Sequence, residues 1–83
     1  MGIENAVNLR RMPTLRELQE GRRKAIVFRA VADNTDVDFI LDTVIPLGVH
    51  EARVHGTFVS GPHSHRQFTG TVSASGGASF DPT

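Results

Sequence analysis

The sequence predicts a mainly β fold: a small antiparallel β-sandwich or β-sheet of about four strands, with an N-terminal arm and one short helix, completed by oligomerisation. Apolar and polar residues alternate along most of the chain, which is typical of half-buried strands. Turn-forming residues separate the alternating runs. The chain has 83 residues with no Cys, Trp or Tyr and only five Phe, so its core is small for an independent domain.

The N-terminal part contains a short helix signal. Thr14 and Glu17 have the spacing of a capping box. Leu15 and Leu18 lie three residues apart and form an apolar stripe. Gly21 suits the left-handed position that often follows a helix. A helix of about two turns is unstable alone, so it needs a surface on which to dock.

Four alternating runs predict strands, over residues 25–32, 37–45, 49–60 and 67–75. The first run is apolar on both faces, as in a buried sheet or at an interface. The second is expected to direct its apolar side chains to one face, namely Val37, Phe39, Leu41 and Ile45. In the third, His50 is expected at the rim of the core and His55 on the outer face beside a polar neighbour.

These elements divide the chain into three parts. Residues 1–12 form the N-terminal arm, because their apolar residues follow no clear period. Residues 13–75 form a single β-rich domain, with the short helix at 14–20. Residues 76–83 have the composition of a linker and are expected to form a flexible C-terminal tail.

The net charge is zero, but the charges are segregated. Lys and Arg gather in residues 1–29, whereas every Asp, Glu, Lys or Arg within residues 30–52 is acidic. Such segregation favours contact between subunits or with a larger assembly. The basic part lacks interleaved aromatic residues, which argues against nucleic acid as a partner. The longest apolar run is only Ala25–Phe28, so a membrane partner is not expected.

The segment Gly61-Pro62-His63-Ser64-His65 is the sharpest candidate site. On an extended segment, residues i and i+2 project to the same side, so both imidazoles can reach one metal ion. Two ligands per chain are too few for a tight site unless a symmetry axis brings copies together. The alternative is an exposed turn with two solvated histidines.

The same segment, with the small residues that follow it, resembles the Gly-x-His-x-His segments of trimeric bacteriophage tail fibre and spike proteins. The resemblance covers residues 61–77. It implies that His63 and His65 of three chains ligate iron on the axis of a homotrimer. It also implies a place in a virion beside other virion structural proteins, after synthesis in the host cytoplasm.

Catalysis finds little support in the sequence. No nucleophile elbow or orienting carboxylate accompanies Ser60 and Ser64, and no glycine loop suits a phosphate. We therefore expect a non-enzymatic structural protein of a phage virion, such as a capsid decoration, spike or fibre-base subunit. Such a subunit associates with itself, docks on a larger assembly and requires no cofactor. The alternative is a small cytoplasmic metal-binding or regulatory β-domain that uses His63 and His65.

The expected contact residues follow from the helix and the first strand. The partner-docking residues are two helix anchors and four charges, namely Leu15, Leu18, Arg16, Arg22, Arg23 and Lys24. The oligomer interface is expected at Ile26, Val27 and Phe28, because that strand is apolar on both faces.

Overall fold

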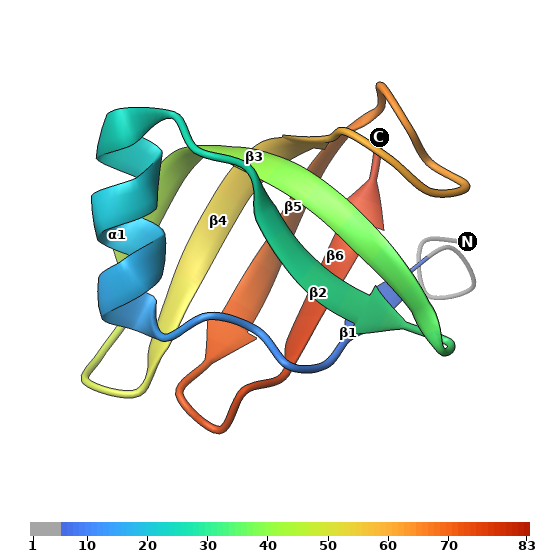
Figure 1. Cartoon of the computed structure of the whole chain (residues 1–83). Helices are drawn as coiled ribbons and strands as arrows, with labels where there is room; N and C mark the ends of the chain where they lie inside the picture. The colour runs from blue at the N-terminus through green and yellow to red at the C-terminus, as the bar shows by residue number, and fades with distance from the viewer. Residues whose placement is uncertain (1–5) are drawn as a thin grey trace.

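The computed structural model describes residues 6–83, which form one six-stranded antiparallel sheet and one helix (Figure 1). The elements are β1 (Val7–Leu9), α1 (Leu15–Lys24), β2 (Phe28–Ala32), β3 (Thr35–Pro46), β4 (Glu51–Phe58), β5 (Gln67–Ser73) and β6 (Ala78–Pro82). The strand order is β1-β6-β5-β4-β3-β2. Arg10 and Val31 exchange two backbone hydrogen bonds, of 2.8 and 2.9 Å, which join the end of β1 to β2. The sheet is therefore a nearly closed barrel.

The mainly β, antiparallel fold is confirmed, but two strands lie where the sequence predicts none. The arm expected at residues 1–12 contains β1, while residues 1–5 lie outside the described part of the chain. The flexible tail expected at residues 76–83 is wrong, because β6 pairs with both β5 and β1 and buries Phe80 completely. A neighbouring chain is not needed to complete the sheet, since the two ends of one chain pair with each other.

The turn between β2 and β3 lies in the gap between two predicted strands, but it is shorter than that gap because β3 begins at Thr35. Asp33 and Asn34 have positive φ angles of 50° and 63°, and Ala32 pairs directly with Thr35. This is a two-residue hairpin turn that requires the left-handed conformation at both positions. Apart from Gly, Asp and Asn adopt that conformation most readily, because their side chains are short and polar.

A β-bulge at Asp42 changes which side chains of β3 face the core. Leu41 pairs with Gly56 and Thr43 with His55, so Asp42 is the extra residue. Beyond the bulge the alternation is reversed: Val44 packs against the core, and Ile45 is 50 % exposed. The expectation that Ile45 shares the buried face of β3 is therefore wrong.

In β4, the alternation holds over the strand itself. Ala52, Val54, Gly56 and Phe58 are buried as expected. His50 is exposed because it precedes the first residue of β4, so its expected place at the rim of the core is wrong.

The helix begins as predicted and ends later. Thr14 caps α1, and its hydroxyl and the Glu17 carboxylate satisfy each other's backbone amides. The chain stays helical to Lys24, and Ala25 takes the left-handed position at a φ of 54°. Gly21 lies inside the helix, where a Cβ would come within 2.2 Å of the Phe28 ring. It allows close packing of helix on strand rather than ending the helix.

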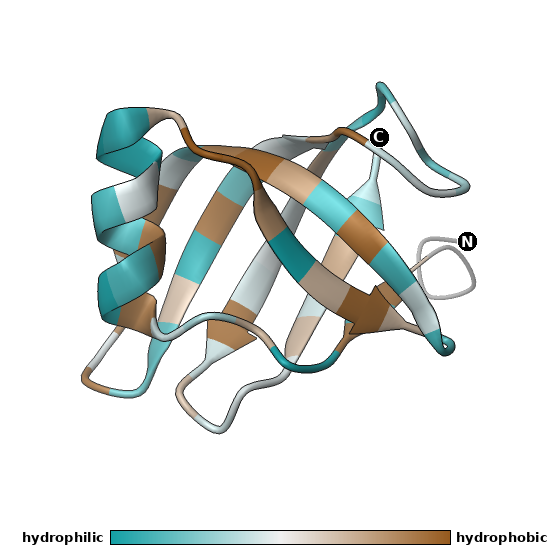
Figure 2. Ribbon diagram, viewed as in Figure 1, coloured by the Kyte–Doolittle hydropathy of each residue, from teal (hydrophilic) through white to brown (hydrophobic). Residues whose placement is uncertain are grey.

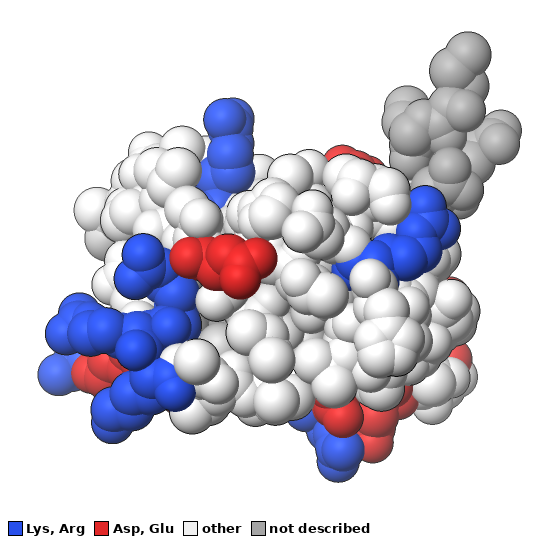
Figure 3. Space-filling model, turned by 90° about the horizontal axis from the view of Figure 1, so that it is seen from above, with Lys and Arg blue, Asp and Glu red and all other residues white. Residues whose placement is uncertain are grey.

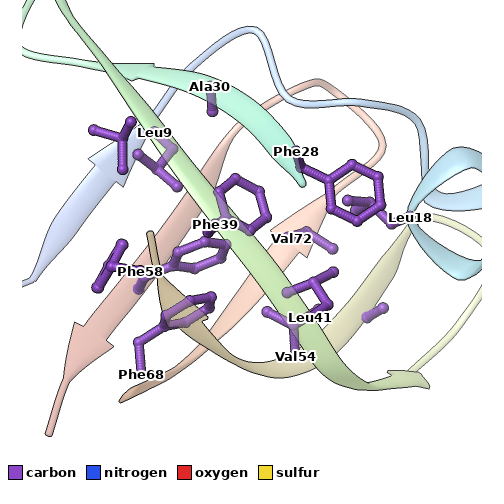
Figure 4. Close-up of a cluster of buried hydrophobic side chains, with 13 residues drawn as sticks. Leu9, Leu18, Phe28, Ala30, Phe39, Leu41, Val54, Phe58, Phe68 and Val72 are labelled. Atoms are coloured by element: carbon purple, nitrogen blue, oxygen red, sulfur yellow. The ribbon is translucent and has the colours of Figure 1, made fainter. Parts of the chain in front are cut away.

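All five phenylalanines lie in one core (Figure 4). The closest pair is Phe68 and Phe80, whose ring centroids are 4.1 Å apart, followed by Phe58 and Phe68 at 4.6 Å. At the helix side, Leu18 is fully buried and lies near Phe28. Figure 2 shows apolar residues along the strands and on the side of α1 next to the sheet. Concentrating the few aromatic residues in one cluster gives a small chain a sufficient core.

Phe80 tests whether the C-terminal segment is structural. Replacing Phe80 by Ala should lower the free energy of unfolding by about 3–5 kcal/mol, because it leaves a cavity among the packed rings. Asp81→Ala, at an exposed position of the same strand, should change it by less than about 0.5 kcal/mol. Urea unfolding followed by circular dichroism measures both. Equal stability of the two variants would contradict the placement of β6.

Candidate functional site

The segment that carries His63 and His65 is the loop between β4 and β5, at the end of the barrel opposite α1 (Figure 1). It is a turn rather than an extended segment. The amide of Ser64 donates to the carbonyl of Gly61 at 3.1 Å, and that of Arg66 donates to His63 at 3.0 Å. His65 has a positive φ of 71°. The expectation of an extended conformation is wrong, so the two imidazoles need not project to one side.

The two histidines have different surroundings. The imidazole of His63 is half-buried, and its centroid lies 5.8 Å from that of the Phe58 ring. His65 is exposed. Within residues 6–83, no group of three or more His, Asp or Glu side chains could hold a metal ion. Metal binding by His63 and His65 between chains stays a prediction.

His63 lines a cavity of about 420 Å³ at this end of the barrel. The residues that line it include the buried apolar Val37 and Phe58 and the polar Asp33, Thr35 and His63. The mouth of a β-barrel is a common place for a small ligand, and this volume lies within the usual range for such sites.

The strongest ion pair joins β2 to β3. Arg29 donates from Nε to Asp38 Oδ1 at 2.8 Å and from a terminal nitrogen to Oδ2 at 3.3 Å. Asp36 lies 3.9 Å from the same guanidinium. The hydrogen bonds from Arg29 hold the pKa of the Asp38 carboxyl below its usual value, and the Arg29 charge adds to this effect. Asp38 therefore already has a partner within its own chain.

The backbone of Asp38 also fixes the start of the β4–β5 loop. Its carbonyl accepts from the amide of Val59 at 2.8 Å, and its amide donates to the Ser60 hydroxyl at 3.1 Å. The loop that carries His63 is thus anchored to β3.

Asp42 lies at the bulge of β3 and contacts two elements. Its carboxylate is 3.3 Å from Nδ1 of His55, which is the polar neighbour expected for that histidine. Its carbonyl accepts from Nε of Arg22 at 3.2 Å, so the last turn of α1 is tied to the outer side of β3.

The expected docking residues of α1 fall into two groups. Leu18 is fully buried and Leu15 packs against the same core, so they anchor the helix to its own barrel. Their assignment as anchors for a partner is wrong, because a small helix needs its apolar stripe to stay docked. The charges are exposed: Arg16 pairs with Glu20 at 3.5 Å, and Arg22, Arg23 and Lys24 follow in the last turn. Figure 3 shows Lys and Arg side chains gathered at one end of the molecule.

The expected oligomer interface is divided as well. Phe28 is only 5 % exposed, and its ring lies 5.7 Å from that of Phe39, so it belongs to the core and not to an interface. Ile26 and Val27 are 45 % and 52 % exposed. They precede β2, which begins only at Phe28, and so remain available for contact.

Comparisons with protein-family models, with curated proteins and with solved structures give no match. The helix in residues 6–83 is too short and too polar to cross a membrane.

Four exposed apolar residues escape the sequence analysis: Ile45, Leu47, Val49 and Val59. Ile45 was assigned to the core because the bulge at Asp42 leaves no sign in the alternation. Leu47 and Val49 flank Gly48 in the β3–β4 turn, and large apolar residues beside a turn glycine are a usable signal of surface exposure.

The Arg29–Asp38 pair gives a pH dependence with a definite sign. Because the folded-state pKa of Asp38 is depressed, the pair stabilises the fold above the unfolded-state pKa of about 4, and this stability is lost as the pH falls through the lower folded-state pKa. Asp38→Asn should therefore melt below the wild type at pH 6, and the gap should narrow below a pH of about 4. Thermal melts across this range measure it.

Asp81→Asn is the matched control, because Asp81 makes no ion pair with a described residue. Its melting temperature should follow that of the wild type at every pH. A gap for Asp38→Asn that stays constant into acid would contradict the assigned pKa direction.

Proposed function

We propose that the protein is a non-enzymatic structural subunit of a phage virion, such as a capsid decoration, spike or fibre-base subunit. It associates with copies of itself and docks on a larger assembly. One observation carries the proposal: large apolar side chains are exposed on a barrel whose own core is already closed. They are Ile26, Val27, Ile45, Leu47, Val49 and Val59.

These side chains form two groups on different parts of the chain. Val27 and Val59 adjoin the outer face of β2 and β3, where Val59 is held by its hydrogen bond to Asp38, and Ile26 lies next to Val27 against Gly21 of α1. Ile45, Leu47 and Val49 lie at the β3–β4 hairpin, where Val49 is 85 % exposed. Single exposed apolar residues are ordinary, but grouped ones favour contact surfaces. Two groups suit a subunit that meets both its own copies and another protein.

The virion assignment is supported by the resemblance of residues 61–77 to phage tail fibre and spike segments. This stretch covers the β4–β5 loop and β5, and Gly61 has the positive φ of 94° that glycine adopts freely. Placement in the virion and synthesis in the host cytoplasm belong to the same proposal, whereas iron bound by His63 and His65 on a trimer axis stays a separate prediction of the resemblance.

The hairpin group provides the test. Virus particles are purified by density gradient from the source of the protein and probed with an antibody raised against the chain. The protein should sediment with the particles. Leu47→Ser combined with Val49→Ser should reduce the particle-bound fraction by about tenfold or more, since it removes the apolar contact.

Thr71→Ser, at an exposed position of β5, is the control and should stay particle-bound. Thermal melts confirm that every variant is folded. Antibody signal that remains in the soluble fraction with the wild-type chain would contradict the proposed function.

A further inference from the structure

The outer face of β2 and β3 has a distinct order of side chains along its length. Val37, Phe39 and Leu41 are buried, so the residues between them on β3 face outward. From the hairpin turn toward α1, the outward residues of β3 are Asp36, Asp38, Ile40 and Asp42. This face thus runs from the β2–β3 turn at one end to the last turn of α1 at the other.

The middle of this face is apolar. Val27 directly precedes β2, whose Phe28 pairs with Phe39, so Val27 lies beside Ile40. Val59 lies beside Asp38 on the other side of β3, through its 2.8 Å hydrogen bond. Together with the half-buried Ile40, the exposed Val27 and Val59 form what we call the apolar middle: Val27, Ile40 and Val59. Figure 2 shows the apolar segment that precedes β2 alongside an apolar part of β3.

The end of this face near α1 is basic. The last turn of the helix carries Arg22, Arg23 and Lys24. Arg22 donates to the carbonyl of Asp42, which places this turn beside the β3 end of the face. The carboxylates near these three cations are Asp42, which lies against His55, and Glu20, which pairs with Arg16. In Figure 3, blue side chains gather at this end, with red side chains beside and among them.

The other end of the face is acidic. Asp33 is exposed in the hairpin turn, and the Asp36 side chain is 63 % exposed with its nearest cation at 3.9 Å. Within residues 6–83, Arg29 is the cation that pairs with Asp36 and Asp38, and it lies closest to Asp38. Asp33 and Asp36 therefore remain available to an external cation.

We propose that this face is self-complementary, so that two copies of the chain pair through it about a two-fold axis that passes through the apolar middle. The rotation sets the basic end of each copy against the acidic end of the other and buries both apolar middles. An interface that uses the same patch on both subunits is the two-fold kind, and charge complementarity fixes its register. The inference rests on the proposed function, because both take exposed apolar side chains as contacts. It adds that the partner at this face is a second copy of the chain and that the pair has two-fold symmetry.

The two-fold arrangement makes a prediction that a trimer does not share. In a three-fold assembly each subunit joins its neighbours through two different patches, so one face cannot meet itself. Light scattering after size exclusion should give twice the 9.0 kDa mass of one chain. A mass three times that of one chain would overturn the inference and favour the trimer.

Charge reversal gives the sharper test. Arg23→Glu with Lys24→Glu reverses the basic end, and Asp36→Lys reverses the acidic end. Each variant alone places like charges at both contacts of the pair and should weaken self-association by about tenfold or more. Mixed in equal amounts, the two variants should recover wild-type affinity, because both contacts of the mixed pair again join opposite charges. Sedimentation equilibrium measures all three samples.

Matched valines control for the apolar middle. Val27→Ser should weaken the pair, whereas Val49→Ser at the β3–β4 hairpin should not, although Val49 is more exposed. All these side chains are at the surface, and thermal melts verify that the variants fold. A wild-type chain that stays monomeric at millimolar concentration, or a mixture that fails to recover, would overturn the inference. Sedimentation with virus particles tests the proposed function separately, so either can fail alone.

Discussion

Closure of the barrel by the two ends of the chain is the constraint on which the rest of the structure depends. β6 pairs with β5 on one side and with β1 on the other, and the Arg10–Val31 bridge carries β1 to β2. Phe80 enters the core from β6 and stacks on Phe68, so ring packing and strand pairing stabilise the same closure. Because 83 residues provide few large side chains, losing this one strand would open both the sheet and the core.

Closure also determines what the surface can do. Leu18 and Phe28, which the sequence analysis predicts as contact residues, are buried in the core of their own chain. The outer apolar residues have no such internal role. The ion pair of Arg29 with Asp38 neutralises part of the acidic segment, and Asp42 lies against His55. Asp33 and Asp36 remain exposed at the end of the face away from the cations of α1. Contact between molecules is therefore left to side chains that the fold itself does not need.

The sequence predicts those parts of the fold that follow from local periodicity and turn chemistry. The strands β2 to β5, the turn between β2 and β3 and the capping box at Thr14 are of this kind. The bulge at Asp42 leaves no local sign, and it reverses the faces of Val44 and Ile45. β6 was missed because Phe80 stands alone among Gly, Ser and Pro, and only pairing with β1, about seventy residues earlier, makes this segment a strand. Of the candidate site, the exposure of Ile26 and Val27 was predictable, whereas the turn at His63 and His65 depends on hydrogen bonds that the carbonyls of Phe58 and Gly61 accept.

Amide hydrogen exchange at Arg10 and Val31, measured by NMR on the dilute chain, tests closure most directly. Each amide donates to the carbonyl of the other residue, at 2.8 and 2.9 Å. If one chain closes its own barrel, both amides should be protected, and their protection should not change when the chain is diluted. Exchange of both at the rate of an unstructured peptide, while amides of β4 and β5 stay protected, would contradict closure within a single chain.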